Sequence, residues 1–481
     1  MSVEYIDFFI DGEKRHFSDK TYQTEAPADR SVIGECPDAS EEDVNAAVAA
    51  ANKAFTECWK DFDPVEREKL LWRWADIVEK NAEKLGEMSG KEGGTPNQAD
   101  GYRYSAEYIR YFAGYATKNY GDVTVNNDDS LCYVVKDPIG TVAVLPAWNT
   151  GGNGAIHKMT PALVCGNTVV IKTAAETPLA SLMLADTIAE AGFPKGVINI
   201  IAGSNRVSGQ QVINHPDVQF VSYTGSVPVG QYIMEKSSPD LKHIGLELGG
   251  KSPFIVFPDV DIDATAKAAV DTIAAYQGQI CSSNSRIIVH ESIKDEFVAK
   301  MKAYAESYQP CLPDNMANVD GPTYGPLFNK RRLDTVVEYV ELGKQEAKLV
   351  AGGEQVTEAP FDKGYYFPPT IFEYEDDSSR VCQEEIFGPV TCVFSFKEKE
   401  EALHLGNNTE FALAASVWTN DQKLIQYFTR NLVSGTVWVR GHNQWLHHNT
   451  WGGPKLSGVG REWGKYVLDH YYDLKTVWIN S

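Results

Sequence analysis

The chain has 481 residues, which is too long for one ordinary hydrophobic core, so two or three domains are expected. Hydrophobic residues make up 43% of it and charged residues 23%, as in an ordinary globular protein. The formal net charge of −22 argues against a nucleic-acid partner, which would require a basic face, and is typical of a solvated acidic surface.

The cysteines and the N-terminus predict a cytoplasmic protein that binds no metal and no membrane. Eight cysteines are dispersed along the chain, and none of them has the C-x-x-C or Cys/His spacing of a zinc site. Such spacing in a long chain is typical of reduced thiols in the cytosol. The acidic N-terminus lacks the apolar core of a signal peptide, and no apolar run approaches the ~20 residues that cross a bilayer.

The first part of the chain predicts short strands and then three layered helices. Residues 8–35 alternate between short apolar runs and turns. Ser40 is expected to begin a helix with Asp43 three positions later, as in a capping box. A second helix follows Asp63-Pro64, and a third spans about 102–117. Nothing in these helices is typical of catalysis.

Residues 119–138 alternate polar and apolar side chains, as in an exposed hairpin or arm. From residue 139, short apolar strands alternate with helices, which is typical of a parallel, doubly wound α/β sheet whose ligands bind beyond the carboxyl ends of the strands. The predicted strands are 141–145, 168–172, 197–201, 218–221 and 243–246, and the predicted helices are 154–164, 178–191, about 206–214 and about 226–236.

A second α/β pattern begins near residue 249. Its predicted strands are 253–257, 285–289, 390–396 and 436–439, and its predicted helices are about 263–276, 292–306, 330–346 and 421–431. The chain ends in an alternating strand, 473–479, whose open edge we expect to pair with a partner subunit.

Two strand ends suggest a nucleotide site. The turn 223–230 joins a strand to a helix, and a pyrophosphate fits at Gly225 and Ser226 because glycine allows close approach and the helix N-terminus offers N–H groups. The turn lacks the G-x-G-x-x-G pattern and taken alone is more often a helix-capping turn without a ligand. Lys172 ends another strand where a ribose would lie, although a lysine there is usually only a solvated charge.

Three other residues have the chemistry of carbonyl oxidation. Cys281 follows Gly278 in a turn that would give a thiol access. Glu247 ends an apolar strand, where desolvation would raise its pKa toward that of a general base. Asn149 follows another strand, and its carboxamide can donate to an oxyanion. Each also has a structural interpretation, as a buried thiol, a salt-bridged carboxylate or a turn asparagine.

Taken together and in this order, the motifs resemble the aldehyde dehydrogenase superfamily over nearly the full chain. The matching stretches are Pro146-Ala147-Trp148-Asn149, 161–163, 166–172, 191–194, Thr224-Gly225-Ser226, Glu247-Leu248-Gly249-Gly250-Lys251, Gly278-Gln279-Ile280-Cys281, 384–389 and 455–462.

The resemblance implies a role for each of the three residues. Cys281 is the nucleophile and forms a thiohemiacetal with the aldehyde, while the oxyanion lies between the Asn149 side chain and the Cys281 backbone N–H. Loss of a hydride to the nicotinamide leaves a thioester, and Glu247 activates the water that releases the acid. A Glu at position 247 favours hydrolysis over transfer to coenzyme A.

The resemblance also implies a dinucleotide site, with one departure. Members strict for NAD often carry a Glu that bonds the adenosine ribose and would repel a 2′-phosphate, whereas Ala175 stands here and Glu176 comes one position late. We therefore expect NAD or NADP. The implied cofactor residues are Lys172 at the adenosine ribose, Gly225 and Ser226 at the pyrophosphate, Glu385 and Phe387 at the nicotinamide ribose and ring, and Trp148, Ala175 and Leu248 beside them.

The substrate pocket departs from the family as well. Thr150 and Gly151 replace the usual aromatic residue and proline after Asn149, and Arg440 replaces a common Asn ahead of His442, Gln444 and His447. An aromatic lining with hydrogen-bonding groups suits an aromatic or polar-tailed aldehyde, such as a hydroxybenzaldehyde or a semialdehyde, better than a cationic aminoaldehyde. The predicted pocket residues are Tyr104, Thr150, His157, Asn443, Trp445 and Trp451.

The family fold implies three units and a homo-oligomer, either a dimer or a tetramer. These are a dinucleotide-binding domain at 1–118 and 139–248, a catalytic domain at 249–455, and an oligomerisation arm at 119–138 and 466–481. One alternative is a cysteine-dependent ester or thioester hydrolase that uses Cys281 and Glu247 without a nucleotide. Another is a non-catalytic relative, which should have lost one of these two residues.

Overall fold

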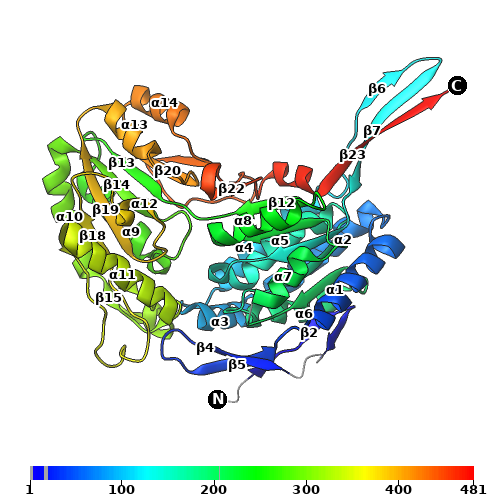
Figure 1. Cartoon of the computed structure of the whole chain (residues 1–481), viewed down its shortest axis with the longest axis horizontal. Helices are drawn as coiled ribbons and strands as arrows, with labels where there is room; N and C mark the ends of the chain where they lie inside the picture. Colours follow the sequence, from blue (N-terminus) through cyan, green and yellow to red (C-terminus); the bar gives the residue numbers. More distant parts are fainter. Residues whose placement is uncertain (1–3, 16–19, 205) are drawn as a thin grey trace.

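The structure is a computed structural model that describes residues 4–15, 20–204 and 206–481. Two lobes lie side by side, and a thin arm projects from the first of them and carries the C-terminus (Figure 1). The first lobe is built on an eight-stranded sheet, the second on a seven-stranded sheet, and the arm is a three-stranded sheet. The predicted class, two α/β units with a small β arm, is confirmed.

The first sheet has a parallel centre with its strands in the order β12-β11-β8-β9-β10. The chain moves outward from β8 to β9 and β10 and then returns to the other side of β8, so the order reverses between β8 and β11. Ligands of such sheets bind beyond the carboxyl ends at that point. The strands are β8 (Thr141–Leu145), β9 (Thr168–Lys172), β10 (Ile198–Ile201), β11 (Phe220–Thr224) and β12 (His243–Glu247), with antiparallel β2 (Phe8–Ile10), β3 (Glu13–Arg15) and β22 (Gly458–Val459) at the edges.

Helices cover this sheet in two groups, one with α1 and α7 and one with α5 and α6. Helix α1 begins at the predicted capping box, because the Ser40 side chain accepts from the Asp43 N–H and Asp43 accepts from the Ser40 N–H. The helices are α1 (Glu41–Ala54), α2 (Pro64–Lys80), α3 (Ala82–Gly93), α4 (Ala99–Ala113), α5 (Gly151–Val164), α6 (Leu179–Ala191), α7 (Arg206–Asn214) and α8 (Val227–Ser237).

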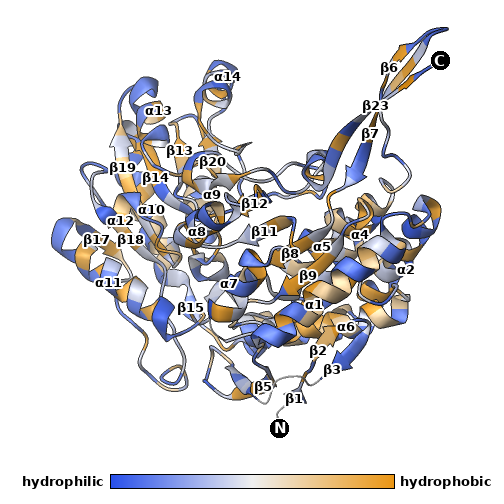
Figure 2. Ribbon diagram, turned by 45° about the vertical axis from the view of Figure 1, so that its right-hand side comes forward, coloured by the Kyte–Doolittle hydropathy of each residue, from blue (hydrophilic) through white to orange (hydrophobic). Residues whose placement is uncertain are grey.

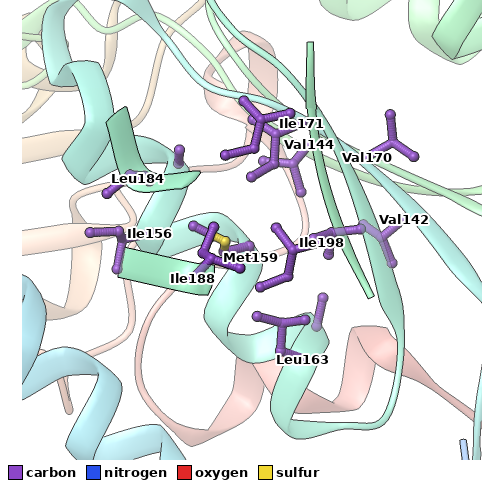
Figure 3. Packing of buried hydrophobic residues seen from close by; sticks show 14 of the residues in the cluster. Val142, Val144, Ile156, Met159, Leu163, Val170, Ile171, Leu184, Ile188 and Ile198 are labelled. Carbon is purple, nitrogen blue, oxygen red and sulfur yellow. The ribbon is translucent and has the colours of Figure 1, made fainter. Parts of the chain in front are cut away.

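The core of this lobe lies between the central strands and α5 and α6. Figure 3 shows Val144 and Ile171 of the sheet close to Met159 of α5 and Ile188 of α6. These side chains are almost completely buried, and each such burial contributes roughly 1.5–3 kcal/mol. The strand ends that carry the candidate site therefore rest on a rigid layer.

Helix α3 corrects the sequence prediction, which placed three helices before the arm where the structure has four in the described chain. Glycines inside a helix weaken its pattern. Here they are needed for packing, because a Cβ at Gly86 would lie 2.2 Å from the Ala99 backbone nitrogen and one at Gly90 would lie 2.7 Å from the Pro96 oxygen. The third predicted helix is also displaced, since α4 spans Ala99–Ala113 rather than about 102–117.

The second sheet has the order β17-β18-β19-β14-β13-β20-β21 and is parallel except for β17. The sequence did not assign β17, β18, β20, α12 or α13. The strands are β13 (Ser252–Val256), β14 (Asn284–His290), β17 (Lys348–Ala351), β18 (Thr370–Glu373), β19 (Val390–Phe396), β20 (Ala414–Trp418) and β21 (Thr436–Val439), and the helices are α9 (Ile262–Ala274), α10 (Lys294–Ser307), α11 (Lys330–Glu346), α12 (Arg380–Gln383), α13 (Lys399–Asn407) and α14 (Gln422–Asn431).

The arm joins the predicted hairpin, β6 (Val123–Asn126) and β7 (Ser130–Pro138), to the last strand, β23 (Tyr472–Asn480). Strand β23 pairs with β7 of its own chain from Tyr472 to Asn480, so the expected pairing with a partner subunit concerns only its other edge. Apolar and polar residues alternate along the arm (Figure 2), and Leu474 and Trp478 are exposed.

Short strands complete the fold: β1 (Glu4–Tyr5), β4 (Thr21–Glu25) and β5 (Val32–Pro37) form a small sheet, and β15 (Gln309–Pro310) pairs with β16 (Thr323–Tyr324). In the described part of the chain, no helix is long and apolar enough to cross a membrane. We propose to divide the chain at the boundaries expected from the sequence, because the two lobes and the arm each contain their own sheet.

Candidate functional site

Four of the predicted residues lie at one edge of the first sheet. Asn149 follows β8, Lys172 ends β9, Gly225 follows β11 and Glu247 ends β12. The carboxyl ends of parallel strands meet at the same edge, which here faces the second lobe, since the Asn149 Nδ2 donates to the Gln279 carbonyl at 2.9 Å. The sheet therefore brings its carboxamide to within two residues of Cys281.

Cys281 lies in the loop between α9 and β14. The predicted helix 263–276 ends at Ala274, because the chain then enters the left-handed region at Tyr276 (φ 49°), Gln277 (φ 56°) and Gly278 (φ 67°). Cys281 is partly exposed, whereas six of the eight cysteines are buried, and all eight are free thiols in the described chain. The turn thus presents this thiol at the surface between the lobes.

The Cys281 thiol is neutral in this arrangement. Its pKa is raised to about 12, mainly by burial and also by the carboxylates of Glu385 and Glu247, while the backbone N–H groups of Cys281 and Ser282 act against the rise. A thiolate is the reactive form. A neighbouring base must therefore remove the proton for the thiol to act as a nucleophile.

Glu247 has the environment of such a base. It is 4% exposed, and its Oε2 makes no hydrogen bond to any described residue. Burial raises its pKa well above the ordinary value and the Glu462 carboxylate adds to the rise, while Lys158 and Arg461 oppose it. An unpaired buried oxygen costs roughly 1–3 kcal/mol, which a reacting water or substrate would offset.

Lys158 and Glu462 were missed by the sequence reasoning. Lys158 is buried on α5, where its Nζ forms an ion pair with Glu462 and lies 3.3 Å from the Ser222 Oγ. Both side chains change the pKa of Glu247, so they belong to its surroundings. A lysine on the inner face of an apolar helix was the signal that could have found them, because a buried charge needs a partner.

The nicotinamide side is formed by Glu385 and Phe387. Glu385 Oε1 accepts from the Gly250 N–H at 3.0 Å, and a Cβ at Gly250 would lie 2.4 Å from the Cys281 carbonyl oxygen, so glycine is required at position 250. Burial raises the pKa of Glu385 to about 7 against that hydrogen bond and Lys251. Phe387 is left-handed (φ 56°), and its ring lies 5.5 Å from the Trp148 ring.

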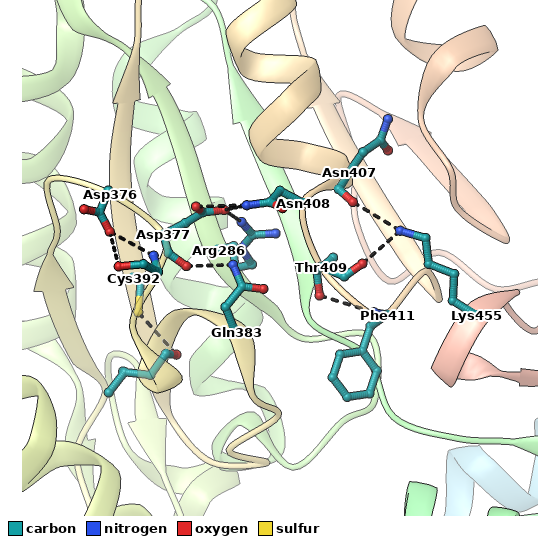
Figure 4. Close-up of polar contacts among 12 residues, drawn as sticks. Arg286, Asp376, Asp377, Gln383, Cys392, Asn407, Asn408, Thr409, Phe411 and Lys455 are labelled. Carbon is teal, nitrogen blue, oxygen red and sulfur yellow. Dashed lines mark hydrogen bonds and ion pairs between the residues drawn. The ribbon is translucent and has the colours of Figure 1, made fainter.

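A polar network fixes the segment that carries Glu385 (Figure 4). The fully buried Arg286 pairs with the Asp377 carboxylate at 2.5 Å, and the Asn408 amide donates to the same group at 3.0 Å. Gln383, the last residue of α12, donates to the Asp377 carbonyl at 2.6 Å. Glu385 therefore lies two residues after a helix end that hydrogen bonds hold in place.

The adenosine side is formed at β9 and β11. Lys172 is 8% exposed, its Nζ donates to the Gly203 carbonyl at 2.9 Å, and burial lowers its pKa to about 8. A Cβ at Gly225 would lie 2.1 Å from the Tyr223 hydroxyl, which also accepts from the Ser226 N–H at 2.9 Å. Ser226 is the N-cap of α8, and its side chain makes no capping bond.

These residues fit a dinucleotide. They combine the reversal point of the sheet, a glycine turn that admits no Cβ and a helix N-terminus with a free N-cap side chain. The remaining predicted cofactor residues are close by: Leu248 is buried against Gly230, and Ala175 is partly exposed three residues after Lys172.

A cluster of aromatic rings surrounds His157. Its Nε2 lies 3.1 Å from the Ser105 Oγ, and its ring centre is 4.6 Å from that of Tyr108 and 5.5 Å from that of Trp463. Burial lowers the pKa of His157 to about 4, so the ring is neutral at pH 7. Tyr104 contacts the same rings, and Trp463 was not predicted.

The loop 440–451 connects this cluster to the thiol. Asn443 Oδ1 accepts from the Oγ of Ser282, the residue after Cys281, at 2.7 Å. At its other end, the His447 ring lies 6.0 Å from the Tyr104 ring. Trp445 and Trp451 of the same loop lie edge to face, with their ring centres 6.1 Å apart. The loop therefore forms a wall that runs from the thiol to the rings.

Two other pocket residues point to local contacts. Thr150 is exposed, and its hydroxyl donates to the Ala147 carbonyl at 3.0 Å. Arg440 is exposed and donates to the Asn420 side chain at 3.0 Å. Among the residues described here, no group of three or more His, Cys, Asp or Glu side chains could hold a metal ion. The roles of all the site residues remain predictions.

Comparisons with known proteins agree over almost the whole chain. The model of a family described as "Aldehyde dehydrogenase family" matches residues 15–477. Aldehyde dehydrogenase 1 of Tanacetum cinerariifolium is 39% identical over 484 residues, covering 99% of this chain and 95% of the relative. Among solved structures, the NAD+ complex of an aldehyde dehydrogenase from Bacillus cereus is 37% identical with a TM-score of 0.94, covering 99% of this chain and 97% of that one. An indole-3-acetaldehyde dehydrogenase of P. syringae, solved with NAD+, is 33% identical with a TM-score of 0.95, covering 100% and 97%.

Proposed function

Because the chain belongs to the aldehyde dehydrogenase family and is thus an NAD(P)-dependent oxidoreductase, we propose that it oxidises aromatic or polar-tailed aldehydes to carboxylic acids through a thioester on Cys281. The observation that carries this proposal is the meeting of three groups from two lobes. The Asn149 amide bonds to the loop of Cys281, and the charge of the buried Glu247 reaches the thiol.

The first half of the reaction is addition to the carbonyl. Glu247 takes the proton of the neutral thiol, and the Cys281 sulfur forms a bond to the aldehyde carbon while the carbonyl π pair moves to oxygen. The Asn149 amide has a second N–H, which donates to this oxyanion together with the Cys281 backbone N–H. When bound, the dinucleotide supplies the acceptor for the hydride that leaves the carbon with its electron pair.

The second half releases the acid. The carbon is now a thioester on Cys281, and Glu247, after it has released the thiol proton to solvent, removes a proton from the attacking water. The water oxygen bonds to the carbon, the carbon–sulfur bond breaks, and the sulfur recovers the proton that Glu247 took from the water. A single sulfur serves as nucleophile and leaving group, so no second covalent residue is needed.

The aromatic rings beside the loop 440–451 support the proposal of an aromatic or polar-tailed aldehyde. Tyr104, Trp463 and the neutral His157 offer flat apolar faces, and the Tyr104 hydroxyl is buried without a well-formed hydrogen bond. Such a surface favours an aromatic tail or a tail with one polar group. The structural relative named for indole-3-acetaldehyde is consistent with an aromatic tail.

We also propose that the arm joins subunits into a dimer or tetramer. Strand β23 has one unpaired edge, and its residues Leu474, Trp478 and Ile479 are exposed. Light scattering of the full chain and of a Trp478→Lys variant measures this. We expect the variant to shift toward a smaller species. A monomeric parent, or a variant that keeps the mass of the parent oligomer, would contradict the proposal.

The experiment that tests the function is a substrate panel with both dinucleotides. Benzaldehyde, 4-hydroxybenzaldehyde, indole-3-acetaldehyde, succinic semialdehyde and propanal are followed by nicotinamide absorbance, and the product acid is identified by mass spectrometry. Cys281→Ser should lower kcat by at least about 10³-fold, because the hydroxyl is a much weaker nucleophile. Turnover of esters but of no aldehyde would favour the hydrolase alternative. An active Cys281→Ser variant would contradict the role of this thiol.

A further inference from the structure

The turn that presents Cys281 is unusual in its backbone. Tyr276 and Gln277 are consecutive non-glycine residues in the left-handed region, directly before the left-handed Gly278. That conformation places Cβ close to the carbonyl oxygen and is costly for every residue except glycine, most of all for a bulky one. It persists only where the surroundings hold it in place.

Two of the three residues are held from within the second lobe. With its amide oriented to match its neighbours, Gln277 accepts from the Gly325 N–H at 2.8 Å and donates to the Pro326 carbonyl at 3.1 Å. Gly278 packs against the segment of Phe387, because a Cβ there would lie 2.1 Å from the Gly388 oxygen.

Tyr276 is held by the first lobe instead. Its ring is 40% exposed and lines a cavity of about 380 Å³ together with Tyr308 and Met316, so packing alone does not fix it. Its hydroxyl donates to the Gln98 Oε1 at 2.5 Å. Gln98 lies at the start of α4, in the lobe that also carries Asn149.

The acceptor for this bond is fixed in advance. The Gln98 Nε2 donates to the Thr95 Oγ1 at 2.9 Å and to the Pro96 carbonyl at 3.0 Å, which determines the direction of the Oε1. A group with its orientation already set loses little entropy when it forms a further bond. Two side-chain bonds from the first lobe therefore reach this segment, one to Tyr276 and one from Asn149 to Gln279.

We propose that Gln98 and Tyr276 are positioning residues for Cys281: their hydrogen bond holds the left-handed turn against the first lobe and so fixes the thiol relative to Asn149. The inference rests on the proposed role of Cys281 as nucleophile. Neither residue touches the reacting atoms. They act by setting the distance between the sulfur on one lobe and the oxyanion donor on the other, and a small change in such a distance lowers the rate strongly.

The test uses the full-length enzyme and the variants Tyr276→Phe, Gln98→Leu and their double variant. Tyr308→Phe is the matched control, because it removes a hydroxyl from the same cavity whose partner, Asp271 at 2.8 Å, lies on α9 rather than across the lobes. For each protein, kcat, the two KM values, the melting temperature and the rate of Cys281 alkylation by iodoacetamide are measured.

We expect kcat to fall about tenfold in each single variant and no further in the double variant, with the KM for the dinucleotide within about twofold of the parent. The alkylation rate of Cys281 should change at least about threefold, and Tyr308→Phe should behave like the parent. Parental kcat and alkylation in both single variants, with or without a lower melting temperature, would overturn the proposal, as would additive losses in the double variant. An active Cys281→Ser enzyme would instead overturn the proposed function itself.

Discussion

The two sides of the candidate site are built in different ways. On one side, Asn149, Lys172 and Glu247 follow directly from parallel strands that rest on a buried core. On the other, Cys281 and the loop 440–451 are held by single hydrogen bonds and ring contacts between distant segments. The base, the oxyanion donor and the dinucleotide therefore rely on a rigid edge, while the nucleophile and the choice of substrate depend on loops.

This difference predicts that substitutions at the strand ends act on rate and substitutions in the ring cluster act on choice of substrate. The largest effect is expected at Glu247. Glu247→Gln removes the base and should lower kcat by about 10²–10⁴-fold. Steady-state turnover with the best aldehyde of the panel, over a range of pH, measures it.

The pH dependence gives this prediction its sign. Because burial and the Glu462 carboxylate raise the pKa of Glu247, the carboxylate is protonated at low pH, and the rate should rise with pH as the proton leaves, well above the ordinary range of a glutamate. Glu247→Gln should lack that rise. Glu385→Gln is the control, since its carboxyl bonds to the Gly250 N–H and should mainly change the KM for the dinucleotide. An unchanged rise in Glu247→Gln would assign it to another group.

The next effect is expected at Asn149. Replacement by Ala removes an oxyanion donor and should lower kcat/KM by about 10²–10³-fold, because such donors act on charge that develops in the transition state. Cys281 should still be alkylated by iodoacetamide in this variant at a rate within about threefold of the parent, since the thiol itself is intact. A loss of turnover that is matched by a loss of alkylation would mean that Asn149 only positions the loop.

The same division explains what could be predicted from the sequence. Strand ends were predictable, because apolar runs give the strands and parallel strands place their ends together, as for Asn149, Lys172 and Glu247. Helix α3 was missed because its Gly86 and Gly90 weaken the helical pattern, while the contacts that require them are made with residues after the helix. Periodicity gives no sign of such contacts.

The loops show the limit more clearly. The motif reached Cys281, but the helix before it was predicted two residues too long, since a left-handed tyrosine is favoured by no local preference. Trp463 joins the site only through its contact with His157, and Glu462 through its ion pair with Lys158, so the sequence pattern did not show that these side chains meet there. Their positions depend on tertiary packing rather than on neighbours in the chain.

A smaller effect is expected at the adenosine end of the rigid edge. Ala175→Glu places a carboxylate three residues after Lys172 and should lower kcat/KM with NADP about tenfold relative to NAD, because it would repel a 2′-phosphate and accept from a 2′-hydroxyl. Ala174→Glu, one position earlier, is the control. The ratio of kcat/KM for the two dinucleotides measures the effect, and an unchanged ratio would remove position 175 from the ribose site.

The smallest effect belongs to the ring cluster. His157→Ala opens space between Tyr108 and Trp463 without touching Cys281, so the ratio of kcat/KM for 4-hydroxybenzaldehyde to that for propanal should fall about three- to tenfold. Turnover of propanal should stay within about threefold of the parent, because its short tail does not reach the rings.

Because the His157 ring is uncharged near neutral pH, its effect on substrate choice should come from packing and not from charge. Since burial lowers its pKa to about 4, the ring stays neutral from pH 6 to 9, and in the parent the ratio of kcat/KM for benzaldehyde to that for propanal should not change with pH, because neither aldehyde titrates in that range. His448→Ala is the control, because its exposed ring lies 6.5 Å from that of Tyr111 and has no contact with His157. If His157→Ala left the ratio unchanged, the tail would bind elsewhere. If it abolished propanal turnover as well, the ring cluster would belong to the rigid, rate-determining side of the site.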